Sequence, residues 1–303
     1  MTAIIANLSA VLAAGWLFRR FGVVDENAEK AFNRYLYYLA LPALIVVKIS
    51  GTPVSGFGWR FLVLNALPPA VLMAAAWGAW RAGLVDWRFA RLLIIVPALG
   101  NTAYLGFPVA SMRLGGGAIG YAAVSASLQN VMVFTFGLAL MTAVGGEGRP
   151  PARFLRRISG NAVLWASLAG LSVSASGLRL PSLVLGVLSD LGRTTLPIAL
   201  FTMGAGLYGK KVAHNLPRIL LVSGLKLLAL PLLYLAGARL AGFSGLASRT
   251  GFIEMAVPVA VLNYIVAREF DFDAELVGQT IVLSTLAFFP LLYLYDWTMV
   301  RFL

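Results

Sequence analysis

Long apolar segments that recur along the whole chain restrict this sequence more than any other feature. Mean hydropathy is +0.85 and 12% of the residues are charged, against about 25% in soluble domains. A helix of about 20 residues crosses the hydrocarbon core of a bilayer. We therefore predict an all-α integral membrane protein with ten transmembrane helices. The ten segments are approximately 3–18, 35–50, 61–80, 92–112, 120–144, 161–178, 183–208, 216–238, 247–266 and 276–300.

The stretches between these segments are short. Ten helices of about 20 residues take roughly 200 of the 303 residues, which leaves too little for a folded domain outside the membrane. The chain has no cysteine and one histidine, His214, so Cys-ligated and multi-His metal sites are excluded. No catalytic constellation is recognisable either. We predict that the protein is not an enzyme and holds no cofactor or metal.

The net charge of +12 indicates orientation in the membrane rather than nucleic-acid binding. If the N-terminus lies outside, fifteen of the 24 Lys and Arg residues fall in cytoplasmic loops and six on the opposite side. The first segment is followed, not preceded, by basic residues (Arg19 and Arg20), the reverse of a secretory signal. We expect a protein integral to the cell membrane, with both termini on the non-cytoplasmic side and no nucleic-acid partner.

The two halves of the chain resemble each other. Residues 145–160 form the longest link, which predicts a cytoplasmic linker between a first five-helix repeat (1–144) and a second (161–303). Because five is an odd number, the two repeats must cross the membrane in opposite directions. We predict a 5+5 inverted repeat. The features that recur in order, 150 to 155 positions apart, are Leu41-Pro42 with Leu196-Pro197, Pro108 with Pro258, and Gln129 with Gln279.

The fourth and ninth segments carry proline and glycine where a regular helix would have to continue. Proline removes one backbone hydrogen bond of a helix, and in lipid the freed groups need other partners. We predict that helices 4 and 9 are broken and that their half-helix ends bind an anion, whereas two merely kinked helices are the alternative. The residues that define these interruptions are Gly100, Gly106, Pro108 and Pro258, with Asn101, Thr102, Glu254 and Asn263 beside them.

These residues also carry a family resemblance. The stretch Gly100-Asn101-Thr102 to Gly106-Phe107-Pro108 resembles the Asn-Thr…Gly-x-Pro crossover of the auxin efflux carrier family, which includes plant PIN carriers and bacterial organic-acid permeases. Ala256-x-Pro258 resembles the second crossover of that family, and the similarity covers essentially the whole chain. The sequence departs from the large plant carriers by lacking their long cytoplasmic loop. It also has Asn65 where they carry an acidic residue.

The resemblance implies an elevator-like secondary carrier for a small organic anion such as a mono- or dicarboxylate. It implies a scaffold of helices 1, 2, 6 and 7 and a transport domain of helices 3–5 and 8–10, which contains the two crossed helices. Asn101, Pro108 and Pro258 carry over as crossover residues, and Gln129 lies in a stretch that resembles the one near the family's substrate site. The resemblance is also compatible with a homodimer.

Several roles remain open among the polar residues of the segments. Glu254 is predicted as a protonation or Na⁺ site, or as the structural partner of Lys226, which could instead neutralise a carboxylate substrate. Gln279, with Gln129 and Glu254, keeps open a Na⁺-coupled carrier similar to bile-acid symporters. A channel is a further alternative, although it would need a continuous polar pore. The predicted substrate-binding residues are Asn101, Thr102, Gln129 and Asn263; membrane lipid is the surrounding partner.

Overall fold

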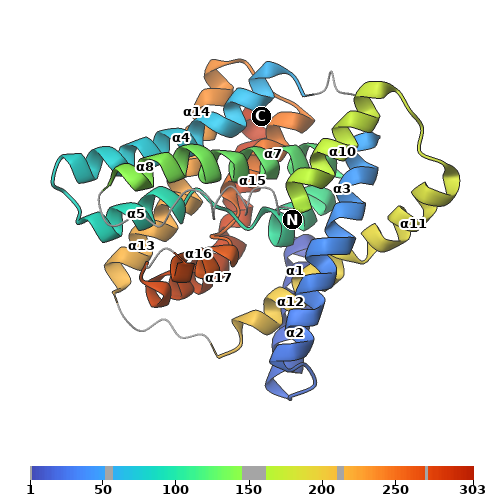
Figure 1. Ribbon diagram of the computed structural model, residues 1–303, viewed down its shortest axis with the longest axis horizontal. Coiled ribbons are helices and arrows are strands. Elements are labelled where there is room, and N and C mark those ends of the chain that lie inside the picture. The colour runs from blue at the N-terminus through green and yellow to red at the C-terminus, as the bar shows by residue number, and fades with distance from the viewer. Residues whose placement is uncertain (1, 52–56, 145–161, 210–214, 270–271) are drawn as a thin grey trace. The chain divides into compact units, whose positions relative to one another are not determined.

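The computed structural model describes residues 2–51, 57–144, 162–209, 215–269 and 272–303 (Figure 1). In these ranges the regular structure is helical throughout, with α-helices, short π-helical turns and no strand. The all-α prediction is thereby confirmed for the described residues. The predicted linker 145–160 and His214 lie outside them. Helical stretches long and apolar enough to cross a membrane are Glu26–Ser50, Trp59–Arg81, Ala118–Met141, Ser182–Leu207, Leu216–Leu240 and Ala274–Phe302.

These six stretches agree with the second, third, fifth, seventh, eighth and tenth predicted segments. The first predicted segment is helix α1 (Thr2–Arg20), and the sixth is the shorter apolar helix α10 (Ala162–Ser176). The fourth and ninth predicted segments are each divided into two helices by residues outside any helix. Length and hydropathy therefore locate the helices, while the divided segments require a separate explanation.

The chain forms two compact units, and each takes residues from both halves of the sequence. The first unit contains Met1–Gly58, Thr102–Ser127 and Asn161–Gly209. The second contains Trp59–Asn101, Leu128–Gly160 and Lys210–Leu303. The fourth predicted segment passes from the second unit into the first between Asn101 and Thr102, and helix α7 (Ala118–Met132) passes back between Ser127 and Leu128.

Glycine allows two helices of the first unit to touch through their backbones. Helix α1 packs along α12 (Thr195–Leu207), and the two lie side by side in Figure 1. A β-carbon at Gly15 would overlap the backbone of Phe201, and one at Gly204 would overlap the backbone of Leu12. Small residues commonly permit this close packing in membrane proteins, where exclusion of water cannot hold helices together. The pair is therefore fixed by the shapes of its two contact faces.

Proline follows three of the π-helical turns at the same distance. In each case the second residue of the next α-helix is proline, which has no N–H to donate and clashes with the carbonyl four residues earlier. A wider π-helical turn in front of the proline accommodates both effects within one continuous helical path. These turns and helices are η1 (Leu36–Ala40) and α3 (Leu41–Ser50), η3 (Thr102–Gly106) and α6 (Phe107–Leu114), and η5 (Leu225–Ala229) and α14 (Leu230–Leu240).

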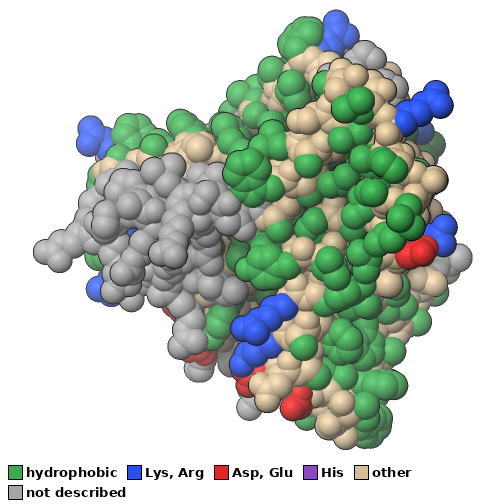
Figure 2. Space-filling view, turned by 45° about the vertical axis from the view of Figure 1, so that its right-hand side comes forward, with side chains coloured by type: hydrophobic (Ala, Val, Ile, Leu, Met, Phe, Trp, Pro, Cys, Tyr) green, Lys and Arg blue, Asp and Glu red, His purple; other side chains and the backbone are tan. Residues whose placement is uncertain are grey.

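Two other helices of the first unit pack against α3. Helix α2 (Glu26–Tyr35) precedes η1, and Asp25 starts α2 by accepting a hydrogen bond from the Ala28 N–H at 2.7 Å. Helices α10 and α11 (Ser182–Arg193) both pack against α3. Leu183 on α11 is 78% exposed and Trp165 on α10 is 56% exposed. Figure 2 shows hydrophobic side chains spread over the right-hand part of that view with few charged ones among them. Such apolar surface is unusual in soluble proteins and suits contact with lipid chains.

The second unit encloses an apolar core built from segments far apart in the sequence. Met73, Leu93, Val133, Val222 and Val266 are among its buried members. Helix α4 lies beside α5 and α8, as Figure 1 also shows. The helices and turns of this unit are α4 (Trp59–Arg81), α5 (Trp87–Ile95), η4 (Val133–Gly137), α8 (Leu138–Ala143), α13 (Leu216–Gly224), η5, α14, α15 (Leu246–Ala256), α16 (Leu262–Glu269) and α17 (Ala274–Phe302).

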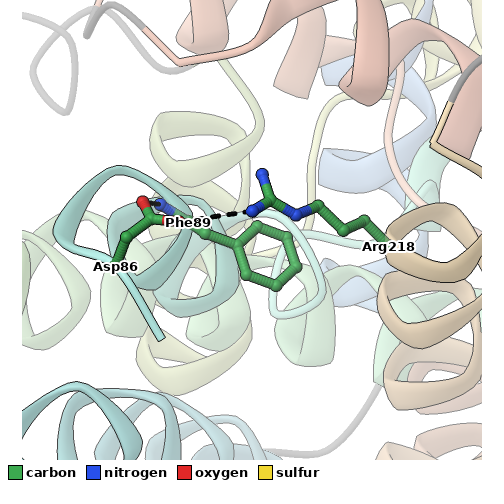
Figure 3. Close-up of polar contacts among 3 residues, drawn as sticks. All are labelled: Asp86, Phe89 and Arg218. Carbon is green, nitrogen blue, oxygen red and sulfur yellow. Dashed lines mark hydrogen bonds and ion pairs between the residues drawn. The ribbon is translucent and has the colours of Figure 1, made fainter. Parts of the chain in front are cut away.

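Asp86 connects the beginning of α5 to the beginning of α13 (Figure 3). Its Oδ1 accepts a hydrogen bond from the Phe89 N–H at 2.9 Å, which caps the first turn of α5. Its Oδ2 lies 3.3 Å from Nη2 of Arg218, and the Arg218 guanidinium lies 4.6 Å from the centre of the Phe89 ring. One aspartate therefore supports both a helix end and a contact between two helices.

Candidate functional site

Both the fourth and the ninth segments are interrupted, but only the ninth is interrupted at its matched proline. Helix α5 ends at Ile95, and residues 96–101 lead without α-helix into the turn η3. Helix α15 ends at Ala256, and residues 257–261, which include Pro258, lead to α16. Pro108, in contrast, is the second residue of α6 and follows the π-helical turn η3 directly, so the helical path continues through this proline. We call residues 96–101 the first break and residues 257–261 the second break.

The two breaks pair with each other inside the second unit. Gly100 and Val259 form an antiparallel β-bridge. The Asn101 N–H donates to the Pro258 carbonyl at 2.8 Å, and the Ala260 N–H donates to the Leu99 carbonyl at 3.0 Å. Backbone groups that leave a helix within a membrane need other partners, because lipid offers none. Here each break supplies partners for the other.

Asn263 and Ser284 complete this arrangement. The Asn263 Nδ2 donates to the carbonyls of Val96, at 3.2 Å, and Leu99, at 2.9 Å, so the side chain caps the carboxyl end of α5. Ser284 on α17 accepts a hydrogen bond from the Val259 N–H at 3.2 Å. Asn263 was predicted from the sequence to bind substrate, but its two amide hydrogens serve the first break. Ser284 was not predicted, because a serine in an apolar helix has no distinguishing signal.

Two opposite charges are fully buried beside the breaks. Lys226 lies in η5, and Glu254 lies in the last turn of α15. The two side chains interact electrostatically. Among the described residues, however, neither the Lys226 ammonium nor either carboxylate oxygen of Glu254 has a hydrogen-bond partner. Both groups can therefore still bind a further partner. A buried charge that is not hydrogen-bonded is unfavourable, so such a partner would stabilise them.

Lys226 reaches the first break at Gly100. A β-carbon at Gly100 would lie 2.5 Å from the Lys226 Nζ and 2.9 Å from a methyl carbon of Val257. The absence of a side chain at Gly100 therefore makes room for the ammonium next to the paired backbones. Two residues predicted separately from the sequence, one as a crossover glycine and one as a charge, are neighbours in the structure.

The two glutamines matched in the repeat make different contacts. The Gln129 side chain donates through Nε2 to the backbone carbonyl of Glu254 at 3.3 Å, which connects α7 to α15 close to the second break. Gln279 on α17 donates through Nε2 to Glu275 Oε1 at 3.1 Å, one turn earlier on its own helix. Among the described residues, Gln129 is the one of the pair whose side chain donates a hydrogen bond to a helix next to a break.

The remaining predicted residues belong to the continuation of the fourth segment. Asn101 is buried at the end of the first break. Thr102, Gly106 and Pro108 follow it in η3 and α6, which belong to the first unit. There η3 packs against α12, and the Tyr104 hydroxyl donates to Asn33 Oδ1 of α2 at 3.1 Å. The predicted site residues are thus divided between the two units at the Asn101–Thr102 bond.

The family to which this architecture corresponds is clear from comparison with known proteins. A family model described as "Membrane transport protein" matches residues 1–295. The chain belongs to this family, the auxin efflux carrier family. Members of the family and the relatives below are membrane transporters rather than enzymes, as predicted. The chain is therefore an integral membrane transporter.

Relatives come from archaea, bacteria and plants. The chain is 26% identical over 296 residues to an "Uncharacterized transporter" of Methanothermobacter thermautotrophicus, with 94% of each chain covered. It is 25% identical over 297 residues to a "Putative malonate transporter" of Rhizobium meliloti, covering 94% of this chain and 92% of that one. A stretch of 117 residues, 38% of this chain, is 26% identical to 32% of the "Probable auxin efflux carrier component 5b" of Oryza sativa subsp. japonica.

Proposed function

We propose that this transporter is a secondary carrier of a small organic anion and that the paired breaks form its binding site. The observation that carries the proposal is the bridge between Gly100 and Val259, with a buried lysine at Gly100. Irregular backbone inside a membrane protein is expected where a ligand is bound, and a buried ammonium favours an anion. The name of the Rhizobium relative suggests dicarboxylates as the first compounds to test.

Counterflow into proteoliposomes tests the substrate class. The purified protein is reconstituted into proteoliposomes, and these are loaded with one member of a panel of mono- and dicarboxylates that includes malonate. Uptake is assayed with and without Na⁺ and a pH gradient. We expect uptake of at least one labelled anion that is driven by the same unlabelled anion inside. Uptake of a neutral or cationic solute, together with no uptake of any anion, would contradict the proposal.

Glu254 favours coupling to a cation. Its carboxylate is buried, and both oxygens lack hydrogen-bond partners in the described part of the chain. H⁺ or Na⁺ could therefore bind there, and the Na⁺ alternative is the one similar to bile-acid symporters. In the counterflow assay, Glu254→Gln is expected to remove the dependence on the coupling ion. Unchanged pH and Na⁺ dependence in this variant would exclude the role.

We also propose ten transmembrane helices in a 5+5 inverted repeat. The six long helices, α1, α10 and the two interrupted segments supply the ten crossings. The grouping of segments 1, 2, 6 and 7 in the first unit supports a scaffold, and movement of the remaining helices against it would give elevator-like alternating access. Residues 102–127 also belong to the first unit, so the moving part would be divided within the fourth segment.

The proposed orientation has both termini on the non-cytoplasmic side, as the charge distribution indicates. We further propose the cell membrane as the location and a homodimer as the assembly, the latter from the family resemblance alone. Labelling of a short tag at either end from outside intact cells tests the orientation. The mass of the detergent-solubilised protein tests the dimer, and a monomeric mass would contradict it.

A further inference from the structure

Lys226 has two neighbours of different kinds within the second unit. One is the first break, where the missing side chain of Gly100 leaves room for the ammonium. The other is the Glu254 carboxylate, which interacts with Lys226 electrostatically but accepts no hydrogen bond from it. An ammonium has three N–H donors. A buried ammonium that donates none of them is destabilising unless a ligand accepts these hydrogen bonds.

Among the described residues on the elements that pack most closely against α15, Lys226 is the charged side chain that interacts with Glu254. These elements are α4, α14, α17 and η5. The other charged residues are Arg60 and Arg81 on α4, Arg239 on α14, Glu275, Asp296 and Arg301 on α17, and Arg249 on α15 itself. Removing either member of the pair therefore leaves the other as an uncompensated charge.

We propose that Lys226 binds the carboxylate of the transported anion directly and that Glu254 compensates the ammonium when the site is empty. This inference rests on the proposed function and specifies which group recognises the substrate's charge. The substrate carboxylate and Glu254 compete for one cation, so the empty site is neutral and binding of the anion adds a negative charge. When the substrate occupies Lys226, Glu254 requires another cation, which links binding of the anion to binding of H⁺ or Na⁺.

A purely structural ion pair makes a different prediction from a ligand site with an internal counter-charge. If the pair only holds the helices together, neutralising both members should restore stability and substrate binding alike. If Lys226 binds the substrate, neutralising both should restore stability alone. The double variant Lys226→Met/Glu254→Gln therefore separates the two interpretations.

The experiment compares the two single variants, the double variant and the wild type in detergent, using malonate as the probe and any other anion active in wild-type counterflow. Thermal unfolding reports stability, and equilibrium binding reports affinity. We expect the double variant to unfold near the wild-type temperature yet bind the anion at least about tenfold more weakly, since a charge-assisted contact has been lost. Glu254→Gln alone should bind it at least as tightly as the wild type, because the competitor has become neutral.

Lys48→Met serves as the matched control, since it removes a lysine charge from α3 in the first unit. It should leave affinity within about twofold of the wild type, well below a tenfold change. Binding by the double variant within that same range would overturn the inference while leaving the proposed function intact. If the wild type itself neither binds nor exchanges any anion of the panel, the proposed function fails, and the role of Lys226 fails with it.

Discussion

Gly100 lies where two buried features meet, the bridge to Val259 and the Lys226 ammonium. The sequence predicted that Gly100 and Lys226 both matter, from the interrupted fourth segment and from an ionisable group in an apolar one. It could not predict that they are neighbours, because they are separated by more than a hundred residues and by several helices. Asn263 shows the same limit. A buried amide next to a break was recognisable, but whether it binds a ligand or caps α5 depends on which carbonyls face it.

Adding a single β-carbon at Gly100 tests the contact between this residue and Lys226. Gly100→Ala should displace the Lys226 ammonium, because the new carbon would lie 2.5 Å from Nζ, and affinity for the transported anion should fall by about tenfold or more. Gly224→Ala is the control, since a β-carbon there meets no atom within 4 Å. Equilibrium binding of malonate measures both variants. Equal affinities for Gly100→Ala and Gly224→Ala would contradict the proposed contact.

The proline of the second break differs in its position from the prolines that follow π-helical turns. Pro258 lies inside the second break, whereas Pro42, Pro108 and Pro231 each occupy the second position of a helix that follows a π-helical turn. Sequence reasoning treated Pro108 and Pro258 as equivalent because they occupy matched positions. The structure distinguishes them, since the helical path continues from η3 through Pro108 into α6, whereas the fourth segment opens earlier, at residues 96–101.

Asp86 provides the test at the scale of elements. Asp86→Ala should lower the free energy of unfolding by about 1 kcal/mol, because it removes the cap from α5. Asp86→Asn should lower it by no more than about 0.5 kcal/mol, because asparagine is also a good cap and a half-exposed ion pair contributes little. Thermal unfolding in one detergent compares them. Equal losses in the two variants would show that the pair with Arg218, not the cap, stabilises this end of α5.

For the whole molecule, apolar segments and their polar boundaries were enough to predict an all-helical membrane protein, because lipid imposes helices of a certain length. The division into two units was harder to predict from the sequence. The resemblance implied a boundary that follows whole helices, yet Thr102–Ser127 belongs to the first unit and Trp59–Asn101 to the second. Such a boundary depends on which side chains meet in space, and periodicity along one segment contains no information about that.

Elevator-like transport predicts that distances change between the units and remain constant within them. The chain contains no cysteine, so spin labels can be attached at introduced cysteines without a background. Leu183 in the first unit and Leu240 in the second are 78% and 91% exposed and suit labelling. We expect the Leu183–Leu240 distance distribution to shift when a transported anion is added. The pair Tyr38–Leu183, within the first unit, is the control, and constant distances in both pairs would contradict the movement.

The paired breaks also determine the order in which parts of this protein can fold during synthesis. The Leu99 carbonyl accepts hydrogen bonds from Ala260 and from Asn263, a residue 164 positions further along the chain. If the fourth segment crosses the membrane as proposed, it enters the bilayer during synthesis long before these partners exist, with backbone groups that lipid cannot satisfy. Until the ninth segment arrives, that stretch must stay hydrated, remain a continuous helix, or be shielded by another protein. The first half of the chain cannot reach its final form alone.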